Sequence, residues 1–455
     1  MRERRQILSS STSALVSLAG GFAGLITVGT GLLLLPISRA SSSSADVITA
    51  LFTATSAVCV TGLVVVNSAD YWSFFGQAVL VALMAMGGLG IMTAGLVILM
   101  AVGRRISLNQ RLIVRDTMGG TSLGNVLAMG RYVIIFALVA QAIGFVALFA
   151  RLIFDYSFTD ALWQSLFHSV SAFNNAGFVI FEDSDSLSRF QDDPILLAII
   201  GLLIVVGALS FPVILDLYRR RRMSRWALDT RLVIFGTVGM WLMGAMVFIV
   251  FELTNDRTLG ELSTAQQIAN GAFQAITART AGFSTIDFSQ TREGTGFLFT
   301  FLMFVGGASG SVAGGIKINT VMVLAYAAIA SVQGRAHTEV ARREIPAEQI
   351  SRALAIFMLA GVAMLTLTTA LAFTERAQLD AGSFAFMDVV FESISAFGTV
   401  GLSRGITPDI TDPGKLILTL AMYVGRLGPL TIALGLALHE RRPIYRYAQE
   451  RVRIG

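Results

Sequence analysis

Charged residues are scarce in this sequence. Only 14% of its 455 residues are charged, whereas 54% are hydrophobic. A soluble domain carries about a quarter charged residues. The shortage of charge therefore excludes an ordinary soluble protein. Cys59 is the only cysteine, so an intramolecular disulfide is excluded as well.

Recognisable enzymatic motifs are also missing. The segment from Gly310 to Lys317 resembles a phosphate-binding loop, but Ile316 separates Gly315 from the lysine, and no Ser or Thr follows the lysine. His168 has no second His or Cys near it, which favours a packed or hydrogen-bonded histidine over a metal ligand. No nucleophile–base pair emerges. We therefore expect neither an enzyme nor a covalent cofactor.

Long hydrophobic runs are abundant. Most of them exceed the ~20 residues that a helix needs to cross the ~30 Å hydrocarbon core of a bilayer. The first run follows a basic start, but it is too long for a signal peptide. We predict an all-α polytopic membrane protein with eight spans, one of them interrupted. The runs are 13–36, 74–102, 132–150, 195–218, 232–253, 297–306 with 315–332, 350–373 and 416–438.

The few charges are distributed unevenly between alternate loops. With the N-terminus placed inside, the inner side holds 23 of the 34 Lys and Arg residues and the outer side holds 20 of the 29 acidic residues. Basic residues concentrate on the cytoplasmic side of membrane proteins, so both termini are expected in the cytoplasm. The basic stretch 219–231 directly abuts a span, which disfavours a nucleic-acid site there. The acidic outer side would attract cations.

An internal repeat organises the chain. After each outward-going span come a segment too short to cross, a small-residue turn and an inward-going span. The short segments are 50–63, 165–178, 272–283 and 390–402. Each places a glycine just before a Leu or Phe, at Gly62, Gly177, Gly282 and Gly401. The repeats are predicted to cover 1–105, 106–222, 223–334 and 335–455.

The four turns have the composition of a cation filter. Glycine allows a positive φ at little steric cost, so successive carbonyls can point one way and replace the hydration shell of a cation. Thr399-Val400-Gly401-Leu402 is close to the TVGY sequence of potassium channels. The alternative is four small-residue turns that pack helices together. The predicted potassium-binding residues are Cys59, Val60, Thr61, Gly62, Asn174, Asn175, Ala176, Gly177, Arg279, Thr280, Ala281, Gly282, Gly398, Thr399, Val400 and Gly401.

The interrupted span predicts a gate. Its glycines carry too much conformational freedom for a continuous helix, and such a break often marks a functional site in transporters. A close helix crossing is the alternative. The predicted gate residues are Gly306, Gly307, Ser309, Gly310, Ser311, Gly314, Gly315, Lys317 and Arg426.

Three cations lie inside the predicted membrane region. Arg426 would cost ~2.5–3.5 kcal/mol at the centre of a span, so we expect it to bind the carbonyls of 306–315. There it would hold that loop closed or steer ions as a fixed positive charge below the filter; the alternative is that it reaches towards the cytoplasm. Lys317 would likewise bind loop carbonyls or reach towards the cytoplasm. Arg279 precedes Gly282 by three residues, and we expect it to point behind the filter and brace the backbone or pair with an acid such as Glu392.

These segments together resemble the Ktr/Trk/HKT superfamily of potassium transporters. The resemblance rests on LFTATSAVCVTGL, GGLGIMT, SLFHSVSAFNNAGF, ITARTAGFSTIDF, GGASGSVAGGIK, SISAFGTVGL and GRLGPLT, and it covers nearly the whole chain. The absence of two additional N-terminal spans makes the chain similar to membrane subunits of the Ktr type (KtrB) rather than to TrkH.

The resemblance implies four repeats around a pseudo-four-fold pore in a bacterial inner membrane. It also implies a homodimer, a cytosolic RCK-type ring (KtrA-like) that carries the nucleotide, and potassium uptake that is often sodium-dependent. Two alternatives remain at this stage. One is a sodium- or proton-coupled transporter of another solute, which inverted repeats would favour. The other is a regulatory membrane subunit without its own flux.

Overall fold

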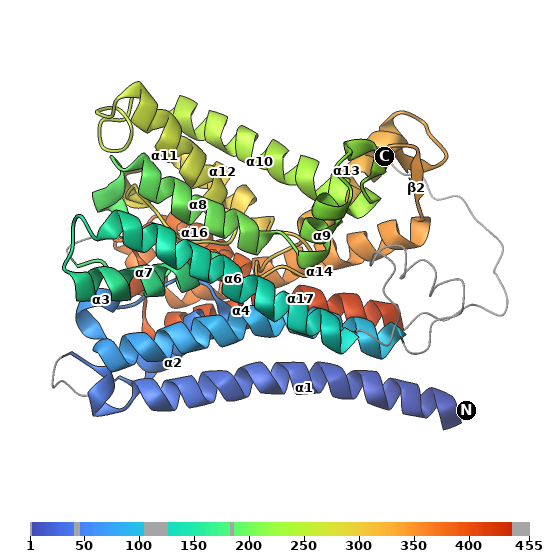
Figure 1. The fold of residues 1–455 in the computed structure, drawn as a ribbon, viewed down its shortest axis with the longest axis horizontal. Helices are drawn as coiled ribbons and strands as arrows, with labels where there is room; N and C mark the ends of the chain where they lie inside the picture. Colours follow the sequence, from blue (N-terminus) through green and yellow to red (C-terminus); the bar gives the residue numbers. More distant parts are fainter. Residues whose placement is uncertain (1, 41–45, 104–125, 183–185, 439–455) are drawn as a thin grey trace.

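The protein is built almost entirely from helices. The structure, a computed structural model, describes residues 2–40, 46–103, 126–182 and 186–438. Long helices run side by side along the long axis of the molecule (Figure 1). The prediction of a helical chain is confirmed. The structure also contains a short β-hairpin that was not predicted from the sequence, in which β1 (Thr338–Val340) pairs with antiparallel β2 (Arg343–Ile345). The predicted inner segments 104–125 and 439–455 lie outside the described residues.

The helices follow one another in four similar sets. Each set begins with a long helix: α1 (Arg2–Leu33), α6 (Val126–Leu152), α10 (Leu228–Glu252) and α14 (Ala347–Thr374). A shorter helix follows: α2 (Val47–Cys59), α7 (Phe158–Phe173), α11 (Thr264–Thr277) and α16 (Phe386–Gly398). Each set ends with α4 (Phe74–Gly103), α8 (Pro194–Ala208) with α9 (Phe211–Arg219), α12 (Glu293–Phe304) with α13 (Ile318–Val332), or α17 (Asp412–Leu438). The one-turn helices α3 (Ser68–Tyr71) and α15 (Arg376–Asp380) lie in connections.

Several helices are suited to a bilayer. Residues 130–152, 228–252 and 347–374 each form a helix long and apolar enough to cross a membrane. Large apolar side chains on these helices are exposed, for example Leu242 and Leu365, each at 67%. Such faces are stable against lipid but not against water. The chain is therefore a membrane protein.

Two of the four short helices begin at side-chain caps. The Asp46 carboxylate accepts hydrogen bonds from the backbone N–H groups of Ile48 and Thr49 at the start of α2. Partial burial raises the pKa of Asp46, but the hydrogen bonds from Thr49 and Ile48 outweigh it and the pKa lies below its usual value. Ser157 caps α7 in the same way. These caps fix where α2 and α7 start and therefore where their other ends lie.

The four sets pack into a closed arrangement. The short helix α2 packs against α4 and α17, α7 against α4 and α8, α11 against α8, and α16 against α12 and α17. The last helix thus contacts the first set. Phe52 of α2, Leu83 of α4 and Leu418 of α17 accordingly belong to one hydrophobic core.

Two of the four sets end in a broken helix. The chain is irregular between Phe304 and Ile318, where the sequence predicts an interrupted span. The prediction of one continuous helix over 195–218 is wrong, because α8 ends at Ala208 and α9 leaves it at an angle of 98°. Pro212 lies in the first turn of α9, where its missing N–H costs nothing, whereas inside a continuous helix it would remove a hydrogen bond.

Candidate functional site

The turns after the four short helices share one backbone conformation. The first left-handed residue is Val60, Asn175, Thr280 or Thr399, with φ of 57°, 57°, 75° and 50°. Two residues later comes Gly62, Gly177, Gly282 or Gly401, with φ of 93°, 69°, 78° and 95°. A β-branched residue at positive φ is strained, and such strain concentrates at functional sites. The same unusual pair of conformations therefore recurs in all four sets.

The four glycines lie against one another's loops in a ring. A Cβ atom added to any of them would overlap a carbonyl oxygen of the next loop. The pairs are Gly62 with Ala176, Gly177 with Ala281, Gly282 with Val400 and Gly401 with Thr61, at 2.5, 2.7, 2.4 and 2.2 Å. The fourth loop contacts the first, so the ring is closed. Only glycine leaves room for these backbone segments to approach so closely.

A vestibule opens above this ring. It is a cavity of about 560 Å³, and all four glycines line it together with polar residues such as Ser284, Ser403 and Asp287. A hydrated ion that entered the vestibule would thus reach the four loops at once. The geometry provides an entrance that leads to a ring of backbone carbonyls.

The first residue of each predicted filter segment lies outside this ring. Cys59 and Gly398 are the last residues of α2 and α16, and Asn174 caps α7. The amide of Asn174 donates to Val170 O at 2.8 Å. Arg279 points behind the third loop, where its Nη2 donates to Gly306 O at 2.6 Å. The contacts between the loops thus join the last two residues of each predicted segment, and Asn175 Nδ2 also donates to Thr280 Oγ1 at 3.4 Å.

Polar side chains of the short helices support the loops from behind. Ser56 accepts from Gly62 N at 3.0 Å, and Ser395 accepts from Gly401 N at 3.1 Å. His168 is fully buried, donates through Nδ1 to Gln164 O at 2.7 Å and accepts from Ile180 N at 3.3 Å. It is therefore a hydrogen-bonded histidine, as the sequence predicts, and it holds the second loop.

Glu392 supports the fourth loop and does not pair with Arg279. Its carboxylate accepts a short hydrogen bond from Ser403 and another from Thr407 at 3.0 Å. The predicted Arg279–Glu392 pair is therefore wrong, because the serine and threonine already satisfy the carboxylate. The other predicted option holds, since Arg279 braces backbone carbonyls at Val305 and Gly306.

The irregular segment 305–317 lies between the ring and the second set. Ala308 N donates to Ala208 O at 3.1 Å, and Val312 N donates to Gly207 O at 3.3 Å. A Cβ on Gly314 would overlap Thr399 Oγ1 at 1.9 Å, so the segment touches the fourth loop directly. The bend after Ala208 frees the carbonyls that receive these bonds. The binding of 305–317 at this bend was not predicted from the sequence, although Pro212 could have indicated that the helix breaks there.

Two cations, buried Arg426 and half-buried Lys317, hold this segment. Arg426 donates a short hydrogen bond to Val312 O and another to Gly87 O at 3.4 Å. Lys317 Nζ donates a short hydrogen bond to Ala313 O. Each cation thus binds loop carbonyls, the first of the two options that the sequence leaves open. Ser309 and Gly310 are exposed, whereas the other predicted gate glycines and Ser311 are buried.

Comparison with known families decides which family this chain belongs to. The family model "TrkH: Cation transport protein" matches residues 19–446. The chain belongs to the TrkH family. TrkH family members are transport proteins, so the prediction that the chain is not an enzyme is confirmed. The family resemblance in the sequence is confirmed as well.

Curated relatives and a solved structure agree with the TrkH assignment. The chain is 38% identical to Ktr system potassium uptake protein B of Bacillus subtilis, over 94% of each chain. It is 35% identical to the potassium/sodium uptake protein NtpJ of Enterococcus hirae, over 96% of each. The crystal structure of the potassium transporter TrkH from Vibrio parahaemolyticus has the same fold, with a TM-score of 0.72 and 19% identity over 94% of this chain and 85% of that one.

Proposed function

We propose that this chain is the ion-conducting membrane subunit of a potassium uptake system. The observation that carries the proposal is the closed ring of four glycine loops, in which each glycine faces a carbonyl of the next loop. Carbonyl oxygens arranged in a ring replace the hydration shell of a monovalent cation. The names of the relatives, which mention potassium and in one case sodium, support potassium as the ion.

The proposed path runs from the vestibule through the ring. The ion binds to the carbonyls around Thr61, Ala176, Ala281 and Val400, and the short helices direct their partly negative C-terminal ends at it. In this account the chain crosses the membrane eight times, and its four repeats surround a pseudo-four-fold pore. Both termini lie in the cytoplasm of a bacterial inner membrane, as the distribution of basic residues favours.

The segment 305–317 is the proposed gate. It lies directly against Thr399, none of its residues lines the vestibule, and its glycines allow it to move without disrupting a packed core. Arg426 and Lys317 hold it through backbone carbonyls. Movement of this segment would open the path below the ring while leaving the ring unchanged.

We expect Arg426→Ala to raise potassium flux. The substitution removes the hydrogen bonds to Val312 and Gly87, and one hydrogen bond to a charged group contributes about 1.5–3 kcal/mol. Since other contacts of the segment remain, flux should rise by roughly three- to tenfold rather than more. Flux into proteoliposomes measures it, with Arg426→Lys as the variant that retains the charge. Reduced flux from well-folded Arg426→Ala protein would contradict the proposed role.

The name of the Ktr relatives implies a system of several components. The assembly in the proposal comprises a homodimer of this chain and a cytosolic RCK-type ring (KtrA-like) that binds the nucleotide. Sodium-dependent uptake is part of the same proposal. The basic inner side would provide the electrostatic attraction for an acidic partner surface.

Growth under potassium limitation tests the function in cells. A strain without its own potassium uptake should grow on limiting potassium when it produces this chain, and faster with a KtrA-like protein and added sodium. A chain that fails to restore growth with the partner present, although it reaches the membrane, would point to a regulatory subunit. Equal growth with and without the partner would contradict the assembly but not the transport.

A further inference from the structure

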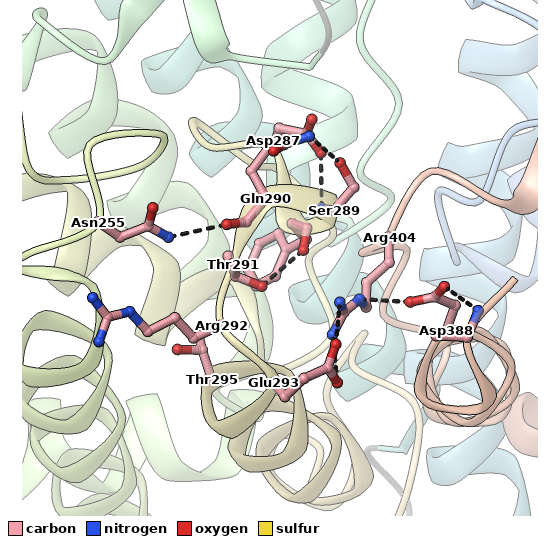
Figure 2. A network of polar contacts seen from close by, with 12 residues as sticks. Asn255, Asp287, Ser289, Gln290, Thr291, Arg292, Glu293, Thr295, Asp388 and Arg404 are labelled. Atoms are coloured by element: carbon pink, nitrogen blue, oxygen red, sulfur yellow. Dashed lines mark hydrogen bonds and ion pairs between the residues drawn. The ribbon is translucent and has the colours of Figure 1, made fainter. Parts of the chain in front are cut away.

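A buried arginine holds the fourth filter loop at its outer end. Arg404 follows Gly401 by three residues and is 7% exposed. Its Nε lies 2.8 Å from Asp388 Oδ1, and its Nη2 lies 3.0 Å from Glu293 Oε1 (Figure 2). A second nitrogen, Nη1, approaches Glu293 Oε2 at 3.5 Å. The guanidinium thus joins the loop to two different helices.

One of the two carboxylates, that of Asp388, is itself fixed in place. Asp388 belongs to the first turn of α16, and its Oδ2 accepts the backbone N–H of Ala385 at 2.9 Å. Glu293 is the first residue of α12 and belongs to the preceding repeat. A Cβ on Gly296 would lie 2.5 Å from Arg404 Nη1, so the missing side chain leaves the space that the guanidinium occupies. The position of Arg404 is therefore defined on several sides.

The arginine does not face the ion path. Its neighbours Ser403 and Gly405 line the vestibule, whereas its own side chain points to α12 and α16 (Figure 2). Two carboxylates surround its charge, so it does not repel cations from the entrance. The residues at the same distance from the other three ring glycines are Val65, Ile180 and Thr285. Only the fourth loop therefore has an arginine at this position.

We propose that Arg404 is a positioning residue for ion selectivity, which acts by fixing the fourth loop to α12 and α16. This inference rests on the proposed function, since it presumes that the ring selects the ion. A planar arginine that binds a carboxylate through two nitrogens fixes both distance and orientation. The loop between Gly401 and Thr407 would otherwise be held through Ser403 and Thr407 on Glu392. Loss of Arg404 frees the outer end of this loop, and the carbonyl of Val400 becomes less well ordered as a result.

Ion selectivity of purified full-length variants tests the proposal. Arg404→Gln should lower the ratio of potassium to sodium flux in proteoliposomes by roughly three- to tenfold. Arg404→Lys keeps a charge beside Asp388 but cannot bind Glu293 through two nitrogens, so it should restore the ratio in part. Arg257→Gln is the matched control, because Arg257 is exposed on the same outer side and bonds only to nearby loop groups in the described structure. A purely structural role would lower both fluxes together and leave the ratio unchanged.

Two further variants keep the test decisive if Arg404→Gln does not fold. Asp388→Asn and Glu293→Gln each neutralise one of the two carboxylates that pair with Arg404. The Glu293 side chain is 66% exposed, so replacing it should not prevent folding. Both should lower the ratio. An unchanged ratio in both, with wild-type potassium flux, would overturn the role of Arg404. Absence of potassium flux from the wild-type protein would instead contradict the proposed function.

Discussion

Replacing Gly401 with Ser is expected to abolish most of the discrimination between potassium and sodium. The added Cβ would lie 2.2 Å from Thr61 O, and the residue would have to keep a φ of 95°. No backbone atom can accept that overlap without moving, so the ring must widen or tilt at this point. The ratio of potassium to sodium flux should fall by roughly tenfold or more, since carbonyl geometry sets selectivity. Gly282→Ser should act in the same way, because its Cβ would lie 2.4 Å from Val400 O.

Gly382 offers a matched control for the filter variants. It also has a positive φ, of 72°, but a Cβ there meets no atom within 4 Å. Gly382→Ser therefore carries the backbone strain without the overlap, and we expect wild-type selectivity. Protein amount in the membrane should be similar for all three variants. Wild-type selectivity in both filter variants would refute the ring as the selecting element.

Deleting residues 309–313 is expected to raise potassium and sodium flux together. The deletion removes Val312 and Ala313, whose carbonyls bind Arg426 and Lys317, and it shortens the part of the chain that touches Thr399. The ring itself is unchanged, so selectivity should stay near that of the wild type. We expect the increase to exceed roughly tenfold, because several contacts are lost at once and each tenfold requires only about 1.4 kcal/mol.

An insertion provides the control for the deletion. Ser309 and Gly310 are exposed, so five extra residues between them would lengthen the segment without entering the core. Flux from the insertion variant should stay at or below the wild-type value. A well-expressed deletion variant whose flux does not rise would indicate that 305–317 is a packing surface rather than an obstacle.

The repeated glycines could be predicted from the sequence because they recur with the same neighbours in each repeat. Gly62, Gly177, Gly282 and Gly401 each precede a Leu or Phe, and the structure places all four in one ring. The left-handed residue two positions earlier could not be predicted. Val, Thr and Asn occupy it, and a β-branched residue normally avoids a positive φ. The conformation ends each helix through local hydrogen bonds, such as Thr61 N to Ser56 O and Val400 N to Ser395 O, both at 2.8 Å. Such a cap usually carries glycine or asparagine, so Val60 and Thr399 gave no signal of it in the sequence.

The bend after Ala208 and the role of Arg404 were missed for related reasons. Leucine, isoleucine and valine dominate 195–206, so hydropathy alone favours one continuous helix there. The bend exists because Pro212 has no N–H to continue the hydrogen bonds of the helix. In addition, backbone N–H groups of 305–317 donate hydrogen bonds to the carbonyls of Gly207 and Ala208. Arg404 is separated from Glu293 by 111 residues, so no spacing rule connects them. Both features depend on where distant repeats meet.

The proposed function requires that this chain by itself conducts potassium through the glycine ring. Cation uptake by purified protein in proteoliposomes, with potassium, rubidium, sodium or choline as the external cation, measures this property. We expect uptake of potassium and rubidium, weaker uptake of sodium, no uptake of choline, and loss of the preference for potassium in Gly401→Ser. Equal uptake of all four cations, or a preference for potassium that persists in Gly401→Ser, would contradict it.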